Sequence, residues 1–189
     1  DRVIQEIRSR LTWQVREEVN ERGYFEISSS PHFREHVISW PAPGSVAGPP
    51  RNIELAHELM HALLAEQVHH QFSGSYFKRG TPEEHIHIVG WACRAASDWF
   101  VDAKLVELAP DQERAEIEEY FGLICRVLRA GPPQGDIFFL LSAGFIFAQA
   151  IKYLGAEIQT AGQLAEVINA FLSTPPENPT VQALEKLIN

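Results

Sequence analysis

The chain has 189 residues, of which 45% are hydrophobic, and it carries a formal net charge of −9. This length fits a single domain over residues 1–189, and the hydrophobic content excludes an intrinsically disordered chain. The acidic balance argues against a broad basic face, so we expect no nucleic-acid partner.

The first predicted element is a helix over residues 2–21, in which apolar side chains recur at helical spacing. Two short strand-like runs follow, at residues 24–28 and 36–40, and turn-forming residues separate them. A loop rich in proline and glycine, residues 41–50, leads to the next helix. The start of the chain therefore predicts a helix followed by a small sheet or hairpin.

The next predicted helix, residues 52–67, contains the sequence His57-Glu58-Leu59-Met60-His61. Residues four apart share one helical face, so the two imidazoles can hold one zinc ion between them. Glu58 follows His57 directly, and this places it beside the metal, where it suits a general base acting on a zinc-bound water. Burial of these three polar groups without a metal or partners is costly, which favours a metal site over two histidines with local hydrogen bonds.

A catalytic zinc ion has three protein ligands and an open fourth position. In the metzincin pattern the third ligand is a histidine six residues after the second, and here that residue is Gln67. A later helix, from about Thr81 to Leu108, offers another source. On it Asp98 and Asp102 lie four residues apart and share a face, among apolar neighbours.

With these two aspartates the chain resembles the gluzincin metallopeptidases, over about residues 52–108. Their signature is HExxH followed by ExxxD on a later antiparallel helix, in which the Glu binds zinc and the Asp orients a ligand histidine. Asp98 stands here in place of the ligand Glu. The resemblance implies that Asp98 is the third zinc ligand and that Asp102 supports a ligand imidazole. Two other interpretations stay open: Asp102 as the ligand, or both aspartates in a solvated face.

The resemblance also implies that the run Val37–Trp40 is a sheet edge to which an extended peptide substrate adds as a strand. His69 and His70 either cap the end of the motif helix or donate a hydrogen bond to the oxyanion of the reaction, and Tyr76 is another candidate donor. We expect the remaining pair of histidines, at 85 and 87, to line the cleft or to lie on the surface.

The rest of the chain predicts helices at about residues 111–129, 136–154 and 160–173, and a short one after Pro179. The longest apolar run, Ile137–Ala148, is shorter than the roughly 20 residues of a typical membrane span, so we expect a buried central helix and no membrane span. Two cysteines without a CxxC partner favour reduced thiols and a cytoplasmic location.

These patterns predict an α+β protein, mostly α-helical, with a zincin-like core over about residues 24–108 and a helical part over about 111–189. A small β-sheet or hairpin precedes the HExxH helix. The predicted function is zinc-dependent hydrolysis of a peptide or protein substrate, with the metal on His57, His61 and Asp98. Two alternatives remain: a regulatory or binding protein of zincin fold with little proteolytic activity, and a helical structural domain in which HExxH is a coincidence.

Overall fold

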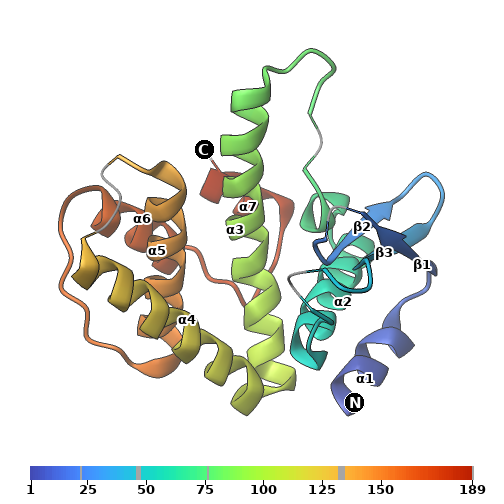
Figure 1. Cartoon of the computed structure of the whole chain (residues 1–189), viewed down its shortest axis with the longest axis horizontal. Coiled ribbons are helices and arrows are strands. Elements are labelled where there is room, and N and C mark those ends of the chain that lie inside the picture. Colours follow the sequence, from blue (N-terminus) through green and yellow to red (C-terminus); the bar gives the residue numbers. More distant parts are fainter. Residues whose placement is uncertain (22, 46–47, 76, 132–134, 189) are drawn as a thin grey trace. The chain divides into compact units, whose positions relative to one another are not determined.

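The computed structural model describes residues 1–21, 23–45, 48–75, 77–131 and 135–188 (Figure 1). Helices make up 62% of the structure and a three-stranded sheet 10%, which confirms the predicted class, α+β and mostly α-helical. The chain forms two compact units. Unit 1 is Asp1–Tyr76 with Pro179–Val181, and unit 2 is Phe77–Asn178 with Gln182–Asn189. That the 189 residues form one domain stays a prediction.

Unit 1 contains the sheet and the HExxH helix. Its elements are α1 (Arg2–Arg10), β1 (Gln14–Asn20), β2 (Glu26–Ser30), β3 (Glu35–Pro41), α2 (Asn52–Gln67) and the 3₁₀ helix η1 (His70–Ser73). The strand order is β1-β3-β2, with β1 parallel and β2 antiparallel to β3. Figure 1 shows the sheet next to α2, so the small sheet predicted ahead of the HExxH helix is confirmed.

The predicted helix over residues 2–21 is wrong beyond Arg10, because the chain continues as β1. Between these elements the backbone N–H groups of Thr12 and Trp13 donate to the Glu66 carboxylate at 2.9–3.0 Å. In a continuous helix these groups would donate to carbonyls four residues earlier. β1 then forms a full ladder with β3. Hydrogen bonds to distant residues therefore override the helical spacing of the apolar side chains.

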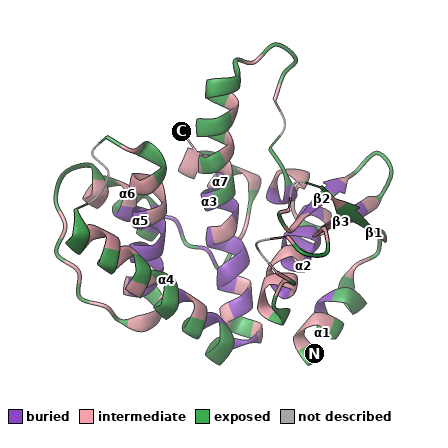
Figure 2. Cartoon of the chain, viewed as in Figure 1, coloured by how far each residue is buried: buried purple, intermediate pink, exposed green. Residues whose placement is uncertain are grey.

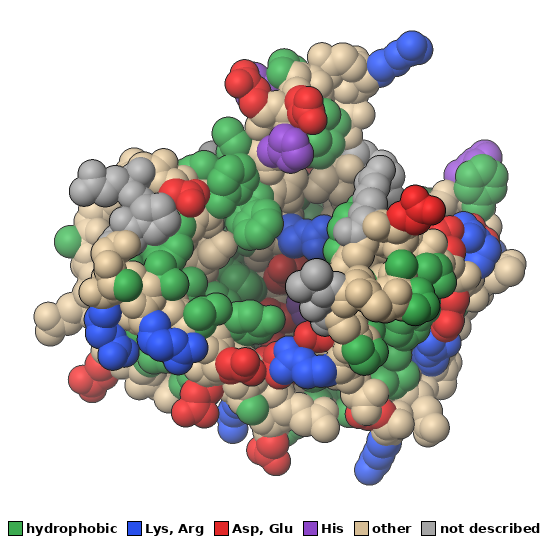
Figure 3. All heavy atoms as spheres, in the orientation of Figure 1, with side chains coloured by type: hydrophobic (Ala, Val, Ile, Leu, Met, Phe, Trp, Pro, Cys, Tyr) green, Lys and Arg blue, Asp and Glu red, His purple; other side chains and the backbone are tan. Residues whose placement is uncertain are grey.

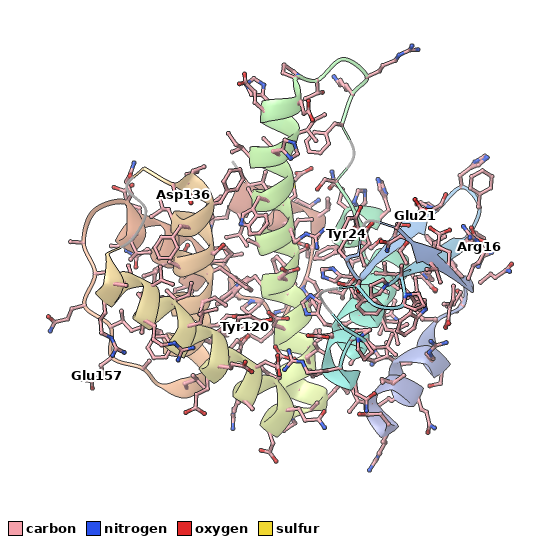
Figure 4. All side chains as sticks on the ribbon, viewed as in Figure 1. Arg16, Glu21, Tyr24, Tyr120, Asp136 and Glu157 are labelled. Carbon is pink, nitrogen blue, oxygen red and sulfur yellow. The ribbon has the colours of Figure 1, made fainter. Side chains whose placement is uncertain are left out.

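β3 is the central strand of the sheet, with a neighbour on each side. The prediction that Val37–Trp40 is an open edge for a peptide substrate is therefore wrong, because β1 and β2 already use its backbone groups. The edges of the sheet are β1 and β2. β1 carries charged side chains, among them Arg16, which Figure 4 shows at the edge of unit 1 and which forms an ion pair of 2.8 Å with Glu18. Such charges discourage further strand pairing at β1.

Unit 2 is built from helices. They are α3 (Glu83–Leu108), α4 (Pro110–Ala130), α5 (Ile137–Gln149) with the π-helical turn η2 (Ala150–Leu154), α6 (Gly162–Leu172) and, from its second residue on, α7 (Val181–Ile188). All five helices predicted after residue 80 are present, with ends shifted by a few residues. Figure 2 shows that α3 is exposed over its first turns and buried over much of its later part. Asp136 begins α5 by accepting hydrogen bonds from the N–H groups of Phe138 and Phe139 (Figure 4).

The segment Ile137–Leu154 is the most apolar helix among the described residues, with a mean hydropathy of 1.8. By length and composition it could cross a membrane, and 39% of it is buried inside the protein. A central helix of a globular protein meets the same criteria. The absence of a membrane span therefore stays a prediction.

Hydrophobic side chains also gather on the surface of unit 2, over the first half of α3 and the start of α5 (Figure 3). Trp91 and Phe138 are 43% and 37% exposed, and their rings meet edge to face with centroids 5.8 Å apart. The Trp91 indole N–H donates to the Ser142 hydroxyl at 3.3 Å, which joins α3 to α5. Some large apolar side chains of unit 2 are therefore partly exposed to solvent and do not belong to its core.

α5 and α6 approach each other closely at Gly144. A Cβ added at Gly144 would lie 2.8 Å from the Cβ of Val167 and would also meet its Cγ1. Because the Cβ of Val167 is attached directly to its backbone, a larger residue at 144 forces one helix to move. The absence of a side chain at this position therefore permits the α5–α6 packing.

We expect Gly144→Ala to destabilise the protein by about 1–3 kcal/mol, the usual effect of overpacking a core. Chemical denaturation followed by circular dichroism measures the change. Gly122→Ala is the matched control, because an added Cβ there meets nothing closer than the Arg126 guanidinium at 3.6 Å. This control should be as stable as the parent or more stable, since alanine favours a helix over glycine. Equal destabilisation by both variants would contradict the close approach.

Candidate functional site

The structure brings His57 and His61 together on one face of α2. Their Nε2 atoms lie 3.0 Å apart, and the rings meet edge to face with centroids 4.8 Å apart. His61 is buried and His57 is half-buried. Two zinc–nitrogen bonds of about 2.0–2.1 Å at a tetrahedral angle separate their nitrogens by roughly 3.3 Å. The observed separation therefore suits two ligands of one ion.

The carbonyl oxygen of Phe72, in η1, selects the tautomer of a neutral His61 ring. The Nδ1 atom of His61 donates a hydrogen bond to this oxygen, because a carbonyl can only accept. The hydrogen of the neutral ring is therefore on Nδ1, and Nε2 directs a lone pair toward His57. Sequence reasoning missed Phe72, because its contribution comes from the backbone and no residue type is required there.

Glu58 is anchored to the edge strand β2. Its Oε2 accepts a hydrogen bond of 2.7 Å from the backbone N–H of Ile27. This N–H points away from β3, since the N–H groups of an antiparallel strand alternate between its partner and its free side. One carboxylate oxygen is thus held by the sheet, and this orients the group that the sequence predicts as the general base.

The two predicted aspartates lie in unit 2, one turn apart on α3. Asp98 is half-buried, and Asp102 is 6% exposed. Oδ2 of Asp102 accepts a hydrogen bond from the side-chain amide of Gln149, which is 1% exposed. The interpretation of Asp102 as part of a solvated face is therefore wrong. The metal-ligand role of Asp98 and the supporting role of Asp102 stay predictions.

The other candidate histidines divide into two groups. His70 begins η1, and burial together with the neighbouring His69 lowers the pKa of its ring below the ordinary value. His85 and His87, on the first turns of α3, are both exposed, which agrees with a surface position. Tyr76, the further candidate oxyanion donor, lies outside the described residues.

A second polar cluster in unit 1, Ser29–His36–Glu66, was not predicted. The Ser29 hydroxyl lies 2.7 Å from Nδ1 of His36, and Nε2 of the same ring lies 2.8 Å from Oε1 of Glu66. The three residues come from β2, β3 and α2, so no spacing in the sequence reveals them. They match the nucleophile, base and orienting acid of a hydrolase in type. Ser29 is 3% exposed and His36 fully buried, however, so the hydroxyl is closed to substrate.

Glu66 also anchors the chain between α1 and β1. Its carboxylate accepts hydrogen bonds from the N–H groups of Thr12 and Trp13 and from the Thr12 hydroxyl, all at 2.8–3.0 Å. The Trp13 ring stacks on the ring of His36, with centroids 5.1 Å apart and 16° between the planes. Hydrogen bonds of this cluster therefore join four segments of unit 1: the turn before β1, β2, β3 and α2.

Comparisons with protein-family models, with curated proteins and with solved structures found no match for this chain. The resemblance to gluzincins stays a prediction, carried by HExxH and DxxxD. Any functional proposal rests on the residues of the site and their geometry.

We expect acid to destabilise the protein through Glu66. Burial by itself would raise the pKa of Glu66, but hydrogen bonds from Trp13, His36 and Thr12 lower it below the ordinary 4.5. Because the pKa is lower in the folded state, the carboxylate contributes its full stabilisation above the unfolded value, and this is lost as the pH falls through the folded one. Urea denaturation between pH 3 and 7 measures the loss.

Glu66→Gln should lower the free energy of unfolding at pH 7 by about 2 kcal/mol and flatten its decline in acid, because hydrogen bonds to a charged group are stronger. Glu6→Gln, at an exposed position of α1, is the control and should keep the parental pH dependence. Parallel curves for the parent and Glu66→Gln would show that this carboxylate does not carry the acid response.

Proposed function

We propose that the chain is a zinc-dependent peptidase in which His57, His61 and Asp98 hold the metal and Glu58 is the general base. The observation that carries the proposal is the pair of Nε2 atoms 3.0 Å apart on α2. The Phe72 carbonyl adds to it, because it leaves the His61 lone pair on the atom that faces His57. A hydrogen bond from Nε2 of His57 and a shared cation both fit this separation, and the proposal is the cation.

The donor types fit zinc. The proposed ligands are the two imidazoles of α2 and the carboxylate of Asp98 on α3. Imidazole nitrogens and a carboxylate oxygen are common zinc ligands, and three of them leave the fourth position open, as in catalytic sites. Asp98 is proposed as the third ligand because it takes the place of the ligand Glu in the DxxxD pattern. Asp102, held by the Gln149 amide one turn further along α3, is proposed to support a ligand imidazole.

A zinc ion bound by these residues would polarise the scissile carbonyl and lower the pKa of water to about 7. Glu58 takes a proton from the attacking water and transfers it to the leaving amine. The Ile27 N–H holds one oxygen of Glu58, so the other oxygen is available for the proton. Phe72 keeps His61 in the tautomer that binds a metal through Nε2.

An extended peptide can add only to an edge strand, and β2 is one, although its Ile27 N–H is already bound to Glu58. β2 is an edge strand, whereas β3 is paired on both sides. We therefore propose β2 in place of Val37–Trp40 as the strand to which substrate adds. Membership of the gluzincin family is proposed on the same grounds, with Asp98 replacing the ligand Glu.

We expect the purified protein to bind about one zinc ion per chain. His57→Ala should abolish this binding, and Asp98→Ala should weaken it strongly, because each change removes a ligand. Elemental analysis after equilibration with zinc measures the stoichiometry, and competition with a chelating dye measures the affinity. His85→Ala, at an exposed position, is the control and should bind zinc like the parent. Unchanged affinity in Asp98→Ala would exclude Asp98 as the third ligand.

Glu58→Gln should keep the zinc and lower peptide hydrolysis by about 10²–10⁴-fold, the usual contribution of a general base. The glutamine carbonyl can still accept the Ile27 N–H, so the strand contact is preserved. Mass spectrometry of a peptide library incubated with zinc-loaded protein measures cleavage. A parent protein that binds zinc but cleaves nothing, with Glu58→Gln equivalent to it in every assay, would favour a regulatory or binding protein.

A further inference from the structure

β2 is joined to α2 by hydrogen bonds at two places. The backbone N–H of Ile27 donates to Glu58, and two residues later the Ser29 hydroxyl is linked through His36 to Glu66. Ile27 and Ser29 are 6% and 3% exposed, whereas Ser28 between them is exposed. The two buried residues therefore share the covered face of the strand, as the alternation of strand side chains requires.

The two linked residues of β2 lie closer together along the strand than their two partners do along α2. Ile27 and Ser29 are separated by roughly 6.7 Å along a strand, and Glu58 and Glu66 by about 12 Å along a helix. The two attachments therefore do not match residue for residue, and a third side chain bridges Ser29 and Glu66. The imidazole of His36 bridges them, because its Nδ1 bonds the Ser29 hydroxyl and its Nε2 bonds the Glu66 carboxylate.

In the Ser29–His36–Glu66 cluster, the acceptors decide which group donates each hydrogen bond. The Glu66 carboxylate only accepts, so Nε2 of His36 donates to it, and in the neutral ring Nδ1 then accepts from the Ser29 hydroxyl. The ring cannot easily turn, because it is fully buried and stacked on Trp13. The position of Ser29 is thus defined relative to the last turn of α2.

We infer that the Ser29–His36–Glu66 cluster sets the position of β2 along α2 and so keeps the Ile27 N–H at the Glu58 carboxylate. The β-ladder fixes β2 only against β3, whereas the Ser29–His36–Glu66 cluster fixes the sheet against the helix α2. Ser29 and His36 are positioning residues, since neither is open to substrate. Their importance for hydrolysis rests on the proposed function, whereas their effect on Ile27 does not.

Amide hydrogen exchange at Ile27, resolved by NMR on the full chain without metal, tests the inference. Ser29→Ala should accelerate exchange at Ile27 by about tenfold or more, corresponding to the loss of roughly 1.4 kcal/mol of local protection. The matched control is Ser28→Ala, on the exposed face of the same strand, which should leave Ile27 unchanged. Ser29→Thr keeps a hydroxyl and should restore most of the protection.

Equal exchange at Ile27 in the two alanine variants would overturn the inference. Acceleration of all amides of unit 1 to the same degree would also overturn it, because a general loss of stability affects every amide and not Ile27 selectively. With zinc-loaded protein, Ser29→Ala should lower kcat while the zinc content stays constant. A parent without zinc or hydrolysis would remove the proposed function, and the exchange result at Ile27 would still decide the positioning role.

Discussion

Unit 1 is organised around the carboxylate of Glu66, in the last turn of α2. It accepts hydrogen bonds from the turn before β1 and from His36 of β3, and through His36 it is linked to Ser29 of β2. A buried carboxylate is costly unless it is fully hydrogen-bonded, and these donors satisfy it. The same bonds decide that the chain after α1 becomes a strand and where the sheet lies on α2.

The candidate site uses residues of the same helix about one and a half to two and a half turns earlier. α2 supplies His57, Glu58 and His61, but the groups that orient two of them come from outside the helix. Ile27 of β2 holds Glu58, and the Phe72 carbonyl of η1 holds His61. Because both are backbone groups of segments packed on α2, the precision of the site depends on the placement of the sheet and of η1. This links the Glu66 cluster to the proposed chemistry.

Two errors of the sequence interpretation, the helix over residues 2–21 and the open edge at Val37–Trp40, have the same physical cause. The spacing of apolar residues over 11–19 fits a helix, but it cannot register that two backbone N–H groups have a distant carboxylate as acceptor. The run Val37–Trp40 is recognisable as a strand, yet its central position depends on β1, which pairs with it in parallel. In both cases the partner, Glu66 or β1, is too far along the chain to affect the local spacing of apolar residues on which the prediction is based.

The sequence by itself determined the features that depend on neighbours within a few turns. These are the predominance of helix, the spans of α2 and α3, the sheet ahead of α2, and the shared face of His57 and His61, which follows from helical geometry. Only the tertiary structure decided the strand order, the anchoring of Glu58 by Ile27, the tautomer of His61 and the Ser29–His36–Glu66 cluster. The hydrogen bonds among these features join residues 7 to 31 apart in the chain, and only folding brings them into contact.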